Sequence, residues 1–131
     1  MSRGSHKVVI KSDDDIKIDE KVNLYLFWGS TCPHCKAEYA FLESLSDEEK
    51  SKFRVYGFEV WNNKENASLM KEFAKITNKE VTGVPYLVIG DSVITGYSDD
   101  ATTGKDIKDL IDKLYTKTDR TDVYKLYQEQ Q

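Results

Sequence analysis

The sequence VNLYLFWGSTCPHC, residues 22–35, decides how this chain folds. Its first half, residues 22–28, is a near-continuous apolar run, which is typical of a β-strand covered on both faces. Residues 29–31 predict a loop. Pro33 suits the first turn of a helix, because its missing N–H would be unpaired there anyway. The stretch therefore predicts a strand, a short loop and a helix that begins at the cysteines.

The two cysteines of this stretch, Cys32 and Cys35, are the only ones among 131 residues. Two thiols at this spacing lie side by side at the start of a helix and can cycle between a dithiol and a disulfide. The thiolate is the reactive form, and a helix N-terminus favours negative charge. We expect an exposed Cys32 to exchange with the substrate and a shielded Cys35, one turn into the helix, to resolve the mixed disulfide.

The residues between the cysteines, Pro33 and His34, are expected to tune this redox pair. Pro33 stiffens the turn. His34 can donate a hydrogen bond or carry a positive charge near the Cys32 sulfur, which lowers the pKa of the thiol. A low thiol pKa stabilises the reduced form and makes the disulfide a better oxidant.

A cysteine pair at this spacing can have two other roles, as a zinc half-site or as a structural disulfide. Zinc usually takes four ligands, and the only histidine outside the pair is His6. A disulfide across two intervening residues closes too small a loop to stabilise the fold much. We therefore expect no metal and no cofactor other than the Cys32–Cys35 disulfide itself.

The remaining elements alternate between strands and helices. Strands are predicted at residues 8–10, 53–61, 84–89 and 92–97, the last two as a hairpin around a Gly-Asp turn. Helices are predicted from residue 33, at a capping box over 46–49, from 62 or 63 to 77, and from a capping box at 103–106. The inward-facing positions are expected to be Ala37, Ala40, Phe41, Leu45, Leu69, Phe73, Ile76, Ile107, Leu110, Ile111 and Leu114. In the polar tail from residue 118, the docking points are expected to be Val123, Tyr124, Leu126 and Tyr127.

Composition narrows the class of protein. Charged residues make up 32% of the chain and the net charge is -4, so no basic face for nucleic acid is expected. No apolar run reaches the roughly 18 residues of a membrane span. Residues 1–6 resemble an expression-tag remnant, and residues 7–131 are expected to form a single, monomeric α/β domain. We expect an extracytoplasmic protein if residues 1–6 replace a signal peptide, and a cytoplasmic protein otherwise.

The motif at residues 28–36, followed about fifty residues later by Gly83-Val84-Pro85, resembles the thioredoxin fold over residues 7–116. The CPHC sequence is similar to the active site of DsbA-type disulfide oxidoreductases, although the chain has the length of a thioredoxin and no room for their helical insertion. The resemblance implies a three-layer α/β/α sandwich with a mixed sheet. It implies a protein disulfide oxidoreductase that works with protein thiols and a redox partner protein.

The resemblance also implies a cis peptide bond before Pro85, next to the cysteines, with the Val84 backbone pairing to substrate. Two positions depart from the thioredoxin pattern. Leu26 stands where a buried aspartate is usual, and Gly57 where its lysine partner is usual. Glu59 is a candidate substitute for the buried acid, although a glutamate at a strand end is more often on the surface.

Alternatives remain open. Val84-Pro85 with the pattern at residues 96–99 is similar to the glutathione site of glutaredoxins, although residues 29–31 lack the expected basic side chain. A non-catalytic thioredoxin-like binding module is a further alternative. Trp28, Tyr86 and Tyr97 are candidates for an apolar rim around the thiol. The direction of electron flow is not decided by these residues.

Overall fold

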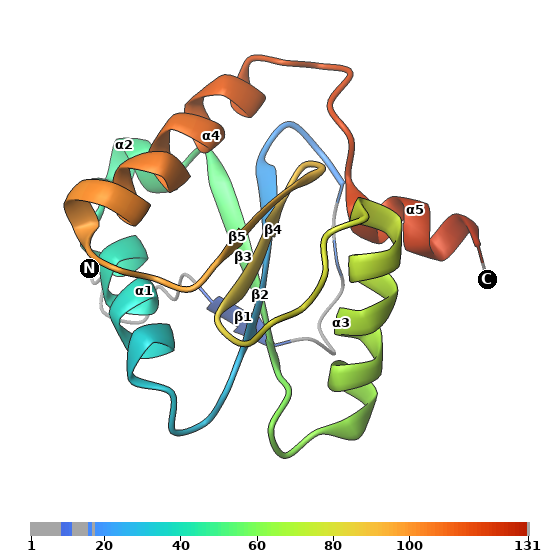
Figure 1. Cartoon of the computed structure of the whole chain (residues 1–131). Coiled ribbons are helices and arrows are strands. Elements are labelled where there is room, and N and C mark those ends of the chain that lie inside the picture. The colour runs from blue at the N-terminus through green and yellow to red at the C-terminus, as the bar shows by residue number, and fades with distance from the viewer. Residues whose placement is uncertain (1–8, 12–15, 17, 131) are drawn as a thin grey trace.

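The computed structural model describes residues 9–11, 16 and 18–130. These residues form a five-stranded sheet in the order β1-β3-β2-β4-β5 (Figure 1). The neighbours β1, β3 and β2 are parallel, whereas β4 and β5 add an antiparallel hairpin on the other side of β2. The strand bounds are β1 Val9–Lys11, β2 Val22–Trp28, β3 Phe53–Glu59, β4 Tyr86–Ile89 and β5 Ser92–Thr95.

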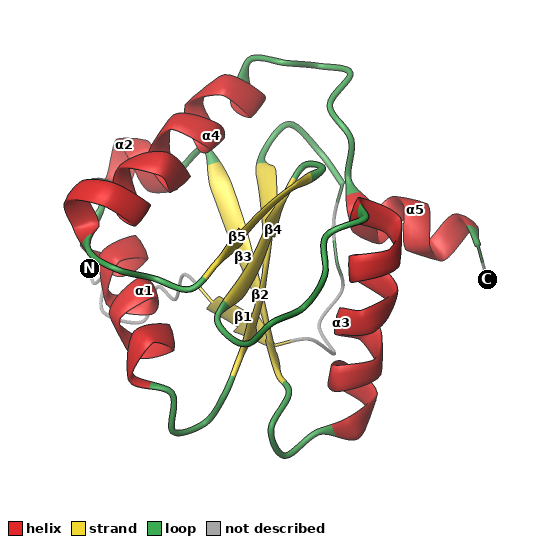
Figure 2. Ribbon diagram, viewed as in Figure 1, coloured by secondary structure: helices red, strands yellow, loops and turns green. Residues whose placement is uncertain are grey.

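Helices cover both faces of the sheet. Figure 2 shows α1 and α4 on one face and α3 with α5 on the other. This is the expected three-layer α/β/α sandwich with a mixed sheet, in a thioredoxin-like arrangement. The helix bounds are α1 Pro33–Ser44, α2 Asp47–Lys50, α3 Lys64–Thr77, α4 Lys105–Tyr115 and α5 Val123–Glu129, with a π-helical turn η2 at Asp100–Gly104. None of the helices in the described part of the chain is long and apolar enough to cross a membrane.

Strand β2 lies at the centre and divides its side chains between two cores. Leu24 and Leu26 belong to the cluster that contains side chains of α1 and α4. Tyr25 and Phe27 belong to the cluster on the α3 and α5 face. Both faces of β2 are thus covered, which explains why its sequence is apolar at nearly every position.

Some element boundaries differ from those predicted. Strand β3 ends at Glu59 rather than at Trp61, because the Glu59 carboxylate accepts the N–H groups of Trp61 and Asn62 and turns the chain out of the sheet. Strand β4 starts at Tyr86, directly after Pro85, which has no N–H to give to a ladder. Strand β5 ends at Thr95. The start of the first predicted strand, residue 8, and the predicted tag at 1–6 lie outside the described residues.

The buried face of α1 is not the one predicted. Ala37 and Ala40 are exposed, whereas Phe41 is buried as expected and Leu45 is half-buried. The helix buries Cys35, Glu38, Phe41 and Leu42. The face that includes Phe41 and Leu42 buries far more apolar area than two alanines would, and it carries Glu38 inward with it.

The start of α4 also differs from prediction. Asp99 caps η2 by accepting the Thr102 N–H at 2.8 Å, and α4 follows after Gly104 without a side-chain cap. The predicted capping residue, Thr103, accepts the Ser98 N–H instead. The predicted apolar face holds along α4 itself, with Ile107, Ile111 and Leu114 buried and Leu110 half-buried.

The C-terminal segment forms α5 and packs against α3. In α3, Met70 and Phe73 are buried, and the predicted inward residues Leu69 and Ile76 are half-buried. Val123 of α5 is fully buried, and its two tyrosines stack near Tyr25 and Phe73. Leu126 is exposed, so the expected apolar docking points are the residues at 123, 124 and 127, and hydrogen bonds from Arg120 to the Lys21 carbonyl and from the Tyr25 hydroxyl to Asp122 also hold the tail.

Candidate active site

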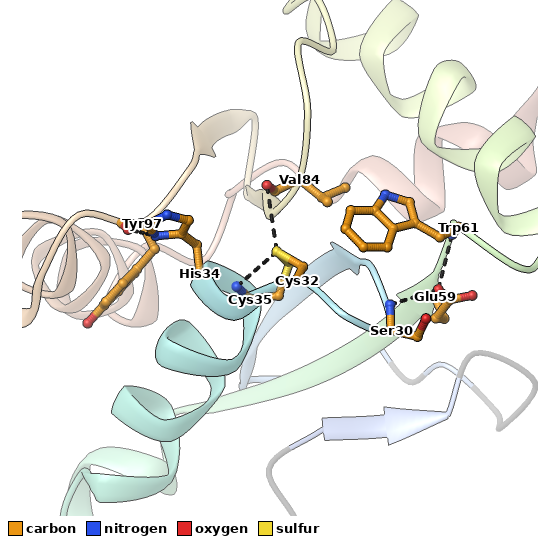
Figure 3. The surroundings of a disulfide bond; sticks show 8 residues. All are labelled: Ser30, Cys32, His34, Cys35, Glu59, Trp61, Val84 and Tyr97. Carbon is orange, nitrogen blue, oxygen red and sulfur yellow. Dashed lines mark hydrogen bonds between the residues drawn. A yellow bond between two sulfur atoms is a disulfide. The ribbon is translucent and has the colours of Figure 1, made fainter.

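The two cysteines lie where β2 passes into α1, and they form a disulfide with their Cα atoms 5.3 Å apart (Figure 3). Both are buried: Cys32 is 4% exposed and Cys35 is 3% exposed. The expectation of an exposed Cys32 is therefore wrong for this oxidised form. The shielding of Cys35 is as expected.

Cys32 is the N-cap residue of α1. Its sulfur accepts the backbone N–H of Cys35 at 3.1 Å, and its backbone has the extended conformation of a cap. Pro33 occupies the first helical position, where its missing N–H costs nothing. The sulfur thus lies at the positive end of the helix dipole, in contact with an N–H that no carbonyl of the helix would otherwise use. A thiolate at Cys32 would be stabilised by both effects.

The segment before β4 lies against the same sulfur. The Val84–Pro85 peptide bond is cis, and the Val84 carbonyl oxygen is 3.9 Å from the Cys32 sulfur. The chain therefore brings Val84 and Pro85 to the cysteines across fifty residues of sequence, as the resemblance implied. A polypeptide bonded to Cys32 would have to pass this backbone.

His34 points away from the sulfurs. Its Nδ1 atom is 3.0 Å from the Tyr97 carbonyl oxygen, and Figure 3 shows the ring on the Tyr97 side of the helix start. The hydrogen bond on the Cys32 sulfur thus comes from the Cys35 amide and not from this imidazole. Any tuning by His34 would therefore act through space and not through a hydrogen bond to the sulfur.

Glu59 joins the loop before α1 to the loop before α3. Its carboxylate accepts the backbone N–H of Ser30 at 3.0 Å, of Trp61 at 3.1 Å and of Asn62 at 2.9 Å. The side chain is half-buried at the end of β3. Glu59 therefore holds the loop that carries Cys32 and is not the buried acid that the sequence analysis considered.

A buried acid does exist, at a position that the sequence analysis did not consider. Glu38 is 0% exposed, and within the described part of the chain neither carboxyl oxygen has a hydrogen-bond partner. Burial raises the pKa of Glu38 to about 8. It follows Cys35 by three residues on the buried face of α1, whereas Leu26 and Gly57 pair across β2 and β3 as an apolar site.

Trp61 is an exposed aromatic side chain at the site that the sequence pattern did not indicate. Trp61 is 52% exposed, and a methyl group at Gly29 would overlap its six-membered ring, so the indole lies on the Gly29 backbone. The expected rim is different: Tyr86 and Tyr97 are buried, and Trp28 is half-buried. The sequence signal for such a role is the position of Trp61, a hydrophobic residue just after β3, whose end lies beside the end of β2.

A mainly apolar cavity of about 310 Å³ lies next to the pair on the Cys35 side. Its lining residues are Leu26, Trp28, Gly29, Ser30, Cys35, Lys36 and Tyr39. The described residues contain no group of three or more His, Cys, Asp or Glu side chains placed to hold a metal ion.

Fold and site together define a thioredoxin-fold protein with a disulfide-forming Cys-X-X-Cys pair at the start of α1. No protein-family model matches the chain, and no curated protein matches it. Among solved structures, the protein is similar to glutaredoxin Grx-1 from Archaeoglobus fulgidus. The TM-score is 0.48 and the identity 23%, with 69% of this chain and 86% of that chain covered.

Proposed function

We propose that this protein is a thiol–disulfide oxidoreductase that exchanges disulfides with protein substrates through Cys32 and Cys35. The observation that carries the proposal is the set of contacts made by the Cys32 sulfur. It caps α1 by accepting the Cys35 N–H, is bonded to the Cys35 sulfur, and lies against the Val84 carbonyl. A structural disulfide needs none of these additional contacts.

The exchange proceeds by two displacements at sulfur. A substrate thiolate attacks the Cys32 sulfur, the Cys32–Cys35 bond breaks, and Cys35 leaves as a thiolate that takes up a proton. A second substrate thiolate then attacks the substrate sulfur of the mixed disulfide and displaces Cys32 as a thiolate. The substrate loses two electrons and the protein gains them. The reverse sequence reduces a substrate disulfide.

The cap supports the oxidising direction. Cys32 is the leaving group in the last displacement, and a thiol of low pKa leaves faster and stabilises the reduced protein. This is the role of the DsbA-type enzymes that the CPHC sequence resembles. A second protein of suitable potential would have to reoxidise the pair. A measured redox potential near that of thioredoxin would instead favour the reducing direction.

Trapping of mixed disulfides tests the proposal. The Cys35→Ser variant keeps the attacking sulfur and lacks the resolving one, so its Cys32 thiolate should attack the disulfides of unfolded proteins, release one substrate thiolate and remain bonded to the other sulfur as an accumulating mixed disulfide. The matched Cys32→Ser variant should accumulate none, because Cys35 is shielded. If neither variant forms mixed disulfides, or if Cys32→Ser leaves every function of the protein intact, the protein is a binding module and not an oxidoreductase.

The glutaredoxin-like alternative has less support. The groups that would hold glutathione at residues 98–99 are engaged in the start of η2, since Ser98 donates its N–H to Thr103 and Asp99 caps Thr102. Turnover of a glutathione mixed disulfide separates the alternatives. We expect only slow chemical exchange, and rapid catalytic turnover would establish the glutathione-dependent function.

A further inference from the structure

We propose that Trp61 binds an apolar side chain of the polypeptide substrate, next to the substrate's reacting cysteine. The inference rests on the proposed function and specifies which substrates the site takes. It gives a role to an aromatic residue that is adjacent to the cysteines and takes no part in the chemistry of the sulfurs.

The exposure of Trp61 calls for an explanation. Among the described residues, no other large hydrophobic side chain is more exposed than this one, at 52%. An indole in water leaves unburied one of the largest apolar surfaces that a side chain offers. The ring belongs to neither of the two hydrophobic clusters that cover the faces of the sheet.

The indole is held in place although it is exposed. The backbone N–H of Trp61 is donated to the Glu59 carboxylate, and the six-membered ring of the indole lies on the backbone of Gly29. The residue before it, Val60, donates its N–H to the Trp28 carbonyl at 2.9 Å, which ties the segment to the end of β2. A surface fixed before binding loses little conformational entropy when a ligand covers it.

The position of the ring indicates what it contacts. In Figure 3 the indole lies beside Val84 on one side of Cys32, and His34 lies on the other side. A substrate chain bonded to the Cys32 sulfur would pass the Val84 backbone, and its next residue lies only about 3.8 Å further along the chain. Figure 3 draws the indole next to the Val84 side chain, and the ring lies on Gly29, whose carbonyl oxygen accepts the Cys32 N–H at 3.1 Å, so that residue would pass the indole.

The chemistry of this space favours an apolar occupant. The isopropyl group of Val84 and the indole of Trp61 offer hydrocarbon surface (Figure 3). The carboxylate of Glu59, at the end of β3, already accepts three backbone N–H groups, so it is poorly placed to recruit a cation. A lysine or arginine over the indole face is the competing occupant, and it is separated from the apolar one by experiment.

The test uses reduced protein and three peptide disulfides that carry leucine, serine or lysine beside the cysteine. We expect the leucine peptide to have the lowest KM. Trp61→Ala should raise the KM for the leucine peptide about tenfold and leave the KM for the serine peptide unchanged. Trp61→Phe should restore part of the preference. A lowest KM for the lysine peptide would overturn the apolar assignment.

A second variant moves the ring without removing it. In Gly29→Ala the new methyl group overlaps the indole, so the ring must shift, and the KM for the leucine peptide should rise as in Trp61→Ala. The double variant should be no worse than Trp61→Ala alone, because both changes act on one contact. Additive losses would mean that Gly29 acts through the loop and not through Trp61.

Two controls keep the outcomes distinct. Tyr115→Ala removes another exposed aromatic side chain, on α4, and should not change the KM for any peptide. Bis(2-hydroxyethyl) disulfide has no side chain to bind and reports reaction at Cys32 alone, and Tyr115→Ala should react with it at the wild-type rate. If it reacts normally and Trp61→Ala keeps the wild-type KM for the leucine peptide, the inference fails and the proposed function stands. If wild-type protein reacts with none of the three peptide disulfides, the proposed function fails.

Discussion

The backbone N–H of Cys35 donates a hydrogen bond to the Cys32 sulfur across 3.1 Å. In the proposed mechanism the resolving residue would thus also supply the donor that stabilises the attacking sulfur, and this donor belongs to the backbone and not to the side chain. Replacing the Cys35 side chain therefore leaves this interaction in place.

The first prediction concerns the acidity of Cys32. In reduced protein the pKa of the Cys32 thiol should lie within about 3.5–7.5, below the value of about 8.5 for a free cysteine. The pH dependence of its alkylation by iodoacetamide measures this pKa. Cys35→Ser keeps the amide donor and should keep the low value. A pKa near 8.5 in both proteins would remove the basis for the oxidising direction.

His34→Ala should raise the pKa of the Cys32 thiol by about one unit, because the first turn of α1 loses a group that can carry positive charge. The reduced form becomes less favoured, so the equilibrium with a glutathione buffer should shift toward the disulfide. Lys36→Ala, at an exposed neighbouring position, is the matched control and should change the pKa much less. Equal shifts of the Cys32 pKa in His34→Ala and Lys36→Ala would show that the pKa responds to the net charge of the helix start and not to His34 in particular.

Glu38 should make stability depend on pH. Its pKa is raised to about 8 in the folded protein from about 4.5, so the folded state holds a proton that the unfolded state releases. The contribution to stability is fully present below about pH 4.5 and is lost as the pH rises toward 8, by at most about 1.4 kcal/mol per pH unit.

Glu38→Gln removes this titration while keeping the shape of the side chain. Urea unfolding at several pH values should show similar stabilities for the two proteins near pH 4.5 and a more stable variant at pH 8. Glu43→Gln, on the same helix but only half-buried, should leave the slope unchanged. Parallel pH profiles for wild type and Glu38→Gln would show that the buried carboxyl group does not ionise over this range.

Glu59→Ala should loosen the loop that carries Cys32. The substitution leaves the N–H groups of Ser30, Trp61 and Asn62 without their acceptor, and we expect the free energy of unfolding to fall by about 1–2 kcal/mol. Hydrogen exchange at Ser30 and Trp61 should speed up more than exchange in β2. Uniform acceleration along the chain would instead indicate a global loss of stability.

Asp122→Ala should detach α5 from the sheet. Asp122 accepts the buried Tyr25 hydroxyl at 2.8 Å and caps α5 by accepting the Lys125 N–H. Burial, together with the Asp122 charge, raises the pKa of Tyr25, so its hydroxyl stays a donor. Loss of the acceptor should lower the free energy of unfolding by about 2 kcal/mol. Asp119→Ala, at an exposed position, is the control in thermal unfolding and should change little.

The parts of the fold that sequence predicts are those set by local pattern. The apolar run of β2 and the spacing of Ile107, Ile111 and Leu114 in α4 are short-range signals, and both elements form where expected. The start of α1 at Pro33 follows from the proline alone. The ends of strands are harder to predict. A side chain such as Glu59 can accept the N–H groups of the residues that follow it, and the strand then ends earlier than the apolar pattern suggests.

The missed features depend on tertiary packing. A glutamate in a helix is normally exposed, so Glu38 was not counted with Phe41 and Leu42, although all three share a face with Cys35. Trp61 continued the apolar pattern of β3 and was assigned to the strand. Only the contact with Gly29 and the turn at Glu59 place its ring beside the cysteines, and neither is local in sequence.

The burial of both sulfurs has a kinetic consequence. Thiol–disulfide exchange needs the attacking sulfur to approach along the axis of the bond that breaks, and rates therefore depend on access as well as on pKa. With Cys32 and Cys35 only 4% and 3% exposed, the oxidised protein presents almost no sulfur to a small thiol that collides at random. An extended chain that first settles against Val84 can deliver its thiolate to Cys32. The disulfide is thus insulated from the bulk thiol pool, and electrons would reach it mainly through partners that bind.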